Sequence, residues 1–148
     1  MAFYRMLVHL HSGLRWIFLL VLLVSIIIAL VGWQRRNKFT VAKNRVFLST
    51  LTIAHLQLVI GFILYFVSPK VIFATNSFSD NMLRFFLIEH ILLMITGITL
   101  ITIGYVKTKK ITIEFKKFRN IFWYFFLALI ITLIAIPWPW QGYGASWG

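Results

Sequence analysis

The chain contains no cysteine. This absence excludes a disulfide framework, a thiolate metal site, an iron–sulfur cluster and the covalent attachment of a c-type haem. Charged residues are also scarce, at 12% of the 148 residues, whereas 61% of the residues are hydrophobic. A soluble protein of this size needs more polar residues than this to cover its surface. We therefore expect a membrane protein.

The sequence also lacks the usual signatures of hydrolytic and phosphate chemistry. It has no cysteine nucleophile, no serine and histidine at a recognisable catalytic spacing, and no glycine-rich phosphate-binding motif. Only one carboxylate lies within the long apolar segments. We therefore expect an electron-transfer or accessory subunit rather than a stand-alone enzyme.

Four apolar segments dominate the chain, and each reaches the ~20 residues that a helix needs to cross the hydrocarbon core. They cover residues 4–33, 45–67, 83–105 and 119–138. The first is too long for a signal peptide and lacks a small-residue cleavage site, so we expect it to be retained as a span. Because the connections are short, the sequence predicts one all-α domain over residues 1–148, a four-helix up-down antiparallel transmembrane bundle.

The net charge of +12 is concentrated in two connections. Eleven basic residues lie on one side of the predicted membrane: Arg35, Arg36, Lys38, Lys43, Arg45, Lys107, Lys109, Lys110, Lys116, Lys117 and Arg119. The other side carries only Arg5, Lys70 and Arg84, together with most of the interfacial aromatic residues, including Trp147. The positive-inside rule then predicts a bacterial inner-membrane protein with both termini periplasmic. Basic residues placed in this way contact anionic lipid headgroups and do not indicate nucleic-acid binding.

Seven polar or ionisable residues lie inside or at the edge of the predicted spans. Such residues are costly in lipid and usually face the bundle interior or a water-filled cavity. They are His9, His11 and Arg15 in the first span, His55 and Gln57 in the second, and Glu89 and His90 in the third.

Helical spacing sorts these residues. His9 and His11 point about 200° apart, so only one of them can face the bundle core, whereas Arg15 shares the face of His11. His11 and His90 each lie roughly 10 Å from the outer ends of their helices, and His55 lies roughly 18 Å from its own. If the first and third helices are diagonal neighbours, two level imidazoles can ligate one haem iron axially. We therefore predict haem b bound by two of His11, His55 and His90, with His11 and His90 preferred.

Several of these residues have a structural alternative. Arg15 and Glu89 either form a buried ion pair, or Arg15 binds a haem propionate and Glu89 bonds a histidine N–H or belongs to a proton path. Gln57 and Glu89 would then belong to a polar network that fixes helix register. His55 could bond a backbone carbonyl or Thr52, and Gly97, two turns after His90, favours close helix packing over space for a macrocycle.

Five stretches of the chain resemble a family of small bacterial four-helix membrane proteins that are often labelled cytochrome b-like. The stretches are LHSGLRW (10–16), AHLQLVIGFILYFVSP (54–69), IEH (88–90), LITIGY (100–105) and IPWPW (136–140). The resemblance covers nearly the whole chain and implies the four-helix fold. It also implies a haem, with the family's histidines at the positions of His11, His55 and His90.

Three hypotheses follow for the function. The first is a b-type cytochrome that passes electrons to or from a membrane quinone or a partner subunit. The second is a non-redox subunit of a larger membrane complex or a homo-oligomer, in which the histidines, Arg15 and Glu89 only fix helix register. The third is copper or zinc binding by His9, His11, His55 or His90, which is less favoured because residues two apart on a helix diverge.

Overall fold

The computed structural model describes residues 2–143, and within this range the chain is helical with no strand. Four helical segments are long and apolar enough to cross a membrane, as the sequence predicts. They are α1 (Ala2–Gln34), α2 (Val41–Val67), a continuous segment from Asn81 to Lys110, and α5 (Glu114–Ala135). Residue 1 and residues 144–148, which include Trp147 and both chain ends, lie outside the described range.

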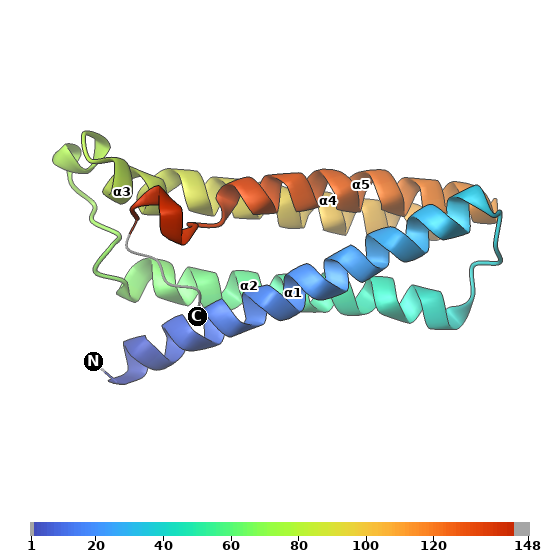
Figure 1. Ribbon diagram of the computed structural model, residues 1–148, viewed down its shortest axis with the longest axis horizontal. Helices are drawn as coiled ribbons and strands as arrows, with labels where there is room; N and C mark the ends of the chain where they lie inside the picture. Colours follow the sequence, from blue (N-terminus) through green and yellow to red (C-terminus); the bar gives the residue numbers. More distant parts are fainter. Residues whose placement is uncertain (1, 144–148) are drawn as a thin grey trace.

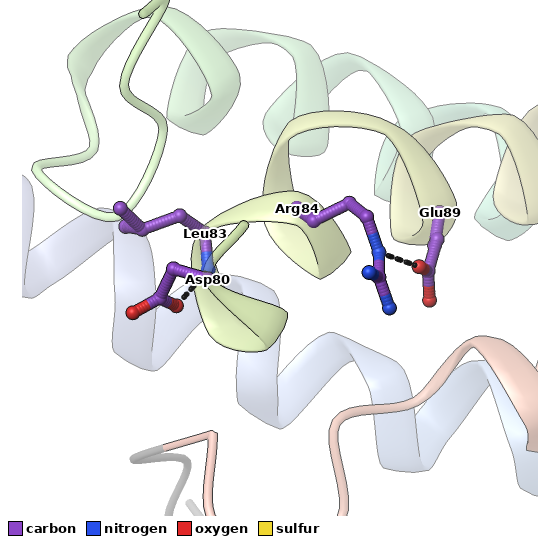
Figure 2. Close-up of polar contacts among 4 residues, drawn as sticks. All are labelled: Asp80, Leu83, Arg84 and Glu89. Carbon is purple, nitrogen blue, oxygen red and sulfur yellow. Dashed lines mark hydrogen bonds and ion pairs between the residues drawn. The ribbon is translucent and has the colours of Figure 1, made fainter. Parts of the chain in front are cut away.

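The third long segment has three parts. It consists of α3 (Asn81–Arg84), a π-helical turn η2 (Phe85–Glu89) and α4 (His90–Lys110). The side chain of Asp80 caps α3 by accepting a hydrogen bond from the Leu83 N–H at 2.9 Å (Figure 2). The N–H of His90 reaches back to the carbonyl of Phe85, five residues earlier. Single π turns of this kind widen the helix locally and are frequent at functional sites.

The helix ends differ from the predicted spans for local reasons. The second helix begins at Val41, four residues before the predicted start, because Thr40 caps its first turn. The third segment extends to Lys110, where lysines in the last turn interact favourably with the helix dipole. The fourth helix ends at Ala135, three residues before the predicted end, because Pro137 and Pro139 cannot continue it. Two short 3₁₀ helices complete the fold, η1 (Thr75–Phe78) and η3 (Pro139–Gln141).

The four long segments surround a common core. Helix α1 packs against α2 and α5, and α4 also packs against α2 and α5, so that α1 and α4 lie across a diagonal. In Figure 1 the connection between α1 and α2 lies at one end of the molecule, whereas η1 and α3 lie at the other end, where α1 begins. The basic residues of both connections fall at the first of these two ends, which we call the basic end.

The core is densest between the middle of the molecule and the basic end. The rings of Phe47 and Phe125 meet edge to face at 6.2 Å, and a buried hydrogen bond of 2.8 Å joins the hydroxyls of Ser25 and Thr50. Gly104 faces Tyr124 of α5 so closely that a Cβ at this position would lie 2.5 Å from the Tyr124 Cβ. The buried apolar residues of this cluster are Phe18, Leu22, Ile26, Ala29, Phe47, Ala54, Ile98, Ile101, Tyr105, Phe118, Ile121, Phe125 and Ala128.

The close approach of α4 to α5 predicts how a methyl group added at Gly104 changes the stability of the protein. Gly104→Ala should destabilise the protein by about 1–3 kcal/mol, because the two helices must move apart. Gly13→Ala is the matched control, since no atom lies within 4 Å of a Cβ at that position. It should be neutral or stabilising by up to about 1 kcal/mol. Thermal unfolding of the detergent-purified proteins, followed by circular dichroism, measures both effects, and equal melting temperatures would contradict the packing described here.

Candidate functional site

A cavity of about 210 Å³ lies among α1, α2, the π turn with α4, and the end of α5, in the half of the molecule opposite the basic end. Its lining is mostly apolar, with Met94, Ile98 and Phe18 towards the packed core. The polar and ionisable residues that line it are Tyr4, His11, Ser12, Arg15, Gln57, Tyr65, Ser68, Lys70, His90 and Thr132. Polar groups thus converge on an apolar space, which is typical of a ligand site in a helical bundle.

His11 and His90 face each other inside this cavity from the diagonal helices α1 and α4. Their ring centroids are 6.4 Å apart and the ring planes are inclined by 72°. A metal ion bound at about 2 Å from one nitrogen of each of two imidazoles places the ring centres roughly 6 Å apart. The observed separation therefore suits two imidazoles that share one metal ion.

The orientation of His90 is fixed by a backbone carbonyl. Its Nδ1 lies 2.7 Å from the carbonyl oxygen of Ala135, the last residue of α5. In a continuous helix that oxygen would accept the N–H of residue 139, but Pro139 has none. Because a carbonyl only accepts hydrogen bonds, Nδ1 carries the proton and Nε2 is left with a lone pair. Histidines that ligate a metal usually donate their other ring N–H to a carbonyl or carboxylate in this way.

His11 is placed by two residues of α2. The amide nitrogen of Gln57 donates a hydrogen bond to the His11 backbone carbonyl at 3.0 Å. Gly61, one turn later, leaves room for the imidazole, since a Cβ at this position would lie 3.3 Å from His11 Cε1. Two buried polar atoms in the cavity, His11 Nδ1 and Gln57 Oε1, have no hydrogen-bond partner among residues 2–143. Such atoms are costly when buried, so the cavity offers hydrogen-bonding positions that a ligand or water could use.

Gly61 was not identified from the sequence, although a signal for it exists. Gln57, Gly61 and Ser68 recur at i, i+4 and i+11 and line the same cavity. A glycine one turn from a glutamine within an apolar span indicates a face on which a neighbouring side chain can lie close to the helix.

His55 and His9 do not reach the cavity. His55 is exposed, and its Nδ1 lies 2.8 Å from the Leu51 carbonyl, as in the structural alternative predicted for it. It lies two residues before Gln57 and therefore points about 200° away from the core face of α2. His55 is therefore not among the residues that line the cavity. His9 is exposed while His11 lines the cavity, which confirms that only one of the pair faces the core.

The predicted pairing of Arg15 with Glu89 is wrong. Glu89 instead forms an ion pair with Arg84, with Arg84 Nε and Glu89 Oε1 2.8 Å apart (Figure 2). Both side chains are more than 40% exposed, so this pair lies at the surface and adds little to stability. Nor does Glu89 contact a histidine N–H, because the Nδ1 of His90 is bonded to Ala135.

Two cations lie at the cavity instead. The guanidinium of Arg15 lies 5.1 Å from the ring centroid of Trp16. The amine of Lys70 lies over the ring of Phe86 at 5.1 Å and donates to the Tyr143 carbonyl at 3.2 Å. Burial lowers the pKa of Lys70 below its usual value, because desolvation penalises the charged amine. Arg15 was predicted as a binding residue, whereas Lys70 had been assigned only to the external connection.

The position of Gly97 confirms the prediction made for it. Gly97 faces α5, with a Cβ position 3.4 Å from Thr132 Oγ1, so it serves helix packing as expected. No group of three or more histidine, aspartate or glutamate residues within the described range is placed to hold a metal ion. A haem needs only two ligands from the protein, and the copper or zinc hypothesis stays a hypothesis.

Comparison of the chain with protein-family models, with curated proteins and with solved structures found no match. The function is therefore inferred from the residues that line the cavity.

The unpartnered oxygen of Gln57 predicts an unusual mutational effect. Gln57→Leu removes the hydrogen bond from Nε2 to the His11 carbonyl, which costs about 1 kcal/mol, but it also removes a buried acceptor that lacks a partner. The two effects oppose each other, so the stability should stay within about 1 kcal/mol of the wild type. Thr50→Val is the control, since the Thr50 hydroxyl bonds that of Ser25. It should destabilise by about 1 kcal/mol because Ser25 is left unpaired. Thermal unfolding of the two variants tests this, and a clear loss of stability in Gln57→Leu would show that the glutamine is held for structure.

Proposed function

We propose that the chain is a b-type cytochrome-like subunit that binds one haem through His11 and His90 and passes electrons to or from a membrane quinone or a partner subunit. The observation that carries this proposal is the 6.4 Å separation of the two rings across the bundle diagonal. The resemblance to cytochrome b-like proteins, carried by the stretches around both histidines, supports the same assignment.

The residues around the two histidines fit this role. The bond from His90 Nδ1 to Ala135 leaves Nε2 for the metal, and Gly61 keeps space beside the ring of His11. The cavity volume of about 210 Å³ is below the roughly 300–1,000 Å³ of pockets for drug-sized ligands. We therefore expect other lining side chains to move aside when haem binds, while His11 and His90 keep their separation.

The protein would ligate the haem iron, offset the charge of the propionates and exclude water from the site. A haem with two imidazole ligands supplies one-electron transfer and has no open position for oxygen. Arg15 and Lys70 would offset the negative charge of the propionates. The apolar lining from Met94 and Ile98 would keep water from the inner side of the site.

We further propose that the four helices form an up-down antiparallel bundle in a bacterial inner membrane, with both termini periplasmic. The support is the excess of lysine and arginine at the basic end, which the positive-inside rule places in the cytoplasm. The histidine cavity would then lie in the periplasmic half of the membrane.

The alternative is a non-redox subunit of a larger membrane complex. The observation that favours it is the hydrogen bond between Gln57 and the His11 carbonyl, which joins α1 to α2 without any cofactor. In this case the polar residues of the cavity would fix helix register, and the protein would co-purify with partners but show no haem spectrum.

The haem proposal is tested by a reduced-minus-oxidised visible spectrum of detergent-purified protein, with haem quantified against protein. We expect stoichiometric low-spin b-type bands, because both axial positions are occupied by imidazole. His11→Ala and His90→Ala should each abolish these bands. His9→Ala and His55→Ala are matched controls on the same two spans as His11 and Gln57, and they should keep the full spectrum because both side chains are exposed.

Either of two results would contradict the assignment. One is full haem content in folded His11→Ala and His90→Ala proteins. The other is absence of haem from wild-type protein produced with ample haem supply, which would favour the assembly subunit.

The topology can be tested directly because the chain has no cysteine of its own. A Ser79→Cys variant should react with a membrane-impermeant thiol reagent in cells whose outer membrane alone has been permeabilised, because Ser79 lies between α2 and α3. A Lys38→Cys variant, at the basic end, should react only after the inner membrane is opened. Both positions are exposed, so the reverse pattern would show the opposite orientation.

A further inference from the structure

A second hollow lies at the basic end, beside the junction of α4 and α5. Its volume is about 250 Å³, and it shares no residue with the histidine cavity. Ile111 bounds it on the α4 side. The α5 side consists of Lys116, Arg119, Asn120 and Trp123, which recur at i, i+3, i+4 and i+7 and so form one face of the helix.

The two cations of this hollow have no aromatic partner among the described residues. Five of the other nine basic residues near the same end lie against aromatic rings, as Lys109 does over Tyr105 at 4.9 Å and Lys117 over Phe39 at 5.2 Å. The remaining four do not line the hollow. For Lys116 and Arg119 the structure shows no ion pair, hydrogen bond or ring contact of the side chain within residues 2–143. Two cations without a counter-ion therefore border one hollow.

The position of Lys116 on the helix is itself unfavourable. Lys116 lies in the first turn of α5, which begins at Glu114, and Arg119 lies one turn later. The N-terminal end of a helix carries a partial positive charge, so cations there are disfavoured and an anion is stabilised. An anion in the hollow would offset the charge of both side chains and of the helix end.

The floor of the hollow is held rigidly. The amide nitrogen of Asn120 donates to the Gly104 carbonyl at 2.7 Å and to Thr108 Oγ1 at 2.9 Å, which ties α5 to the end of α4. Trp123 packs against Trp33 of α1 with ring centroids 6.3 Å apart, while half of its surface stays exposed. A tryptophan held in this way is typical of the membrane interface.

An exposed apolar stripe continues from the hollow along α5 and indicates the kind of anion. Trp123, Leu127, Ile130 and Ile134 recur at i, i+4, i+7 and i+11, and each is between 41% and 59% exposed. In a membrane this stripe faces lipid chains. A free phosphate would contact only the cations, whereas a phospholipid would also cover the stripe with an acyl chain.

We infer that this hollow binds the phosphate of an anionic phospholipid, with Lys116 and Arg119 on the phosphate and Trp123 beside the glycerol. One acyl chain lies along the stripe towards Ile134. Under the proposed topology the lipid belongs to the cytoplasmic leaflet, where basic pockets between helices bind anionic headgroups. The inference does not depend on haem binding.

Native mass spectrometry of the delipidated, detergent-purified full chain tests the inference. Phosphatidylglycerol, phosphatidylcholine and inorganic phosphate are titrated separately. We expect one tight phosphatidylglycerol adduct and much weaker binding of the other two. In the double variant Lys116→Gln/Arg119→Gln the affinity for phosphatidylglycerol should fall by about 30-fold, which corresponds to about 2 kcal/mol.

The matched control removes the same charge outside the hollow. Arg35→Gln/Lys110→Gln also removes one arginine and one lysine from the basic end, and it should keep the tight adduct. The conservative variant Lys116→Arg/Arg119→Lys should keep most of the affinity, which separates the loss of charge from a change in folding. Equal weakening in both glutamine variants, equal binding of phosphatidylcholine, or inorganic phosphate binding as tightly as the lipid would each overturn the inference.

Discussion

The constraint on which the rest of this structure depends is that backbone polar groups in hydrocarbon must find partners within the protein. Four long helices satisfy almost all of them internally. The candidate site lies where the series of backbone hydrogen bonds within the helices is interrupted. At the end of α5, Pro139 leaves the Ala135 carbonyl without its helical donor, and the imidazole of His90 takes that position. At the start of α4, the π turn shifts the bonding pattern by one residue immediately before His90. Two local interruptions on adjacent helices therefore fix one side chain.

The two halves of the molecule differ in how their helices are packed. Near the basic end, aromatic rings and glycines bring the helices into close contact, as at Gly104 and Tyr124. In the other half the polar side chains of α1, α2 and α4 keep an open cavity among them. The opening is limited to that half because the packed half holds the helix pairs together. A cavity next to a rigid core allows lining residues to move on ligand binding without loss of the fold.

Helical periodicity predicted much of this arrangement from the sequence. The length of the apolar runs identified the four spans, and periodicity showed that only one of His9 and His11 can face the core. The expected partners of Glu89 were inferred from its position near the histidines, without the π turn. Residues five apart diverge on an α-helix, but across a π turn they share a face, so Arg84 and Glu89 meet. For His55, helical periodicity alone could have shown the direction of the side chain. His55 and Gln57 lie two residues apart and cannot both face one core, and Gln57 is the one that does.

Other features depend on contacts between helices, which a single sequence does not specify. The role of Gly61 depends on how closely α2 approaches His11, and the position of Lys70 depends on how the chain after α2 returns over the cavity. The basic end illustrates the same limit. Positive charge in the connections is explained fully by topology, and nothing in the sequence separates Lys117, which lies on the ring of Phe39, from Lys116, which borders a hollow. Only the fold distinguishes cations with aromatic partners from cations that border a hollow. Under the proposed topology and lipid site, the charge that orients the helices would also recognise the membrane in which they lie.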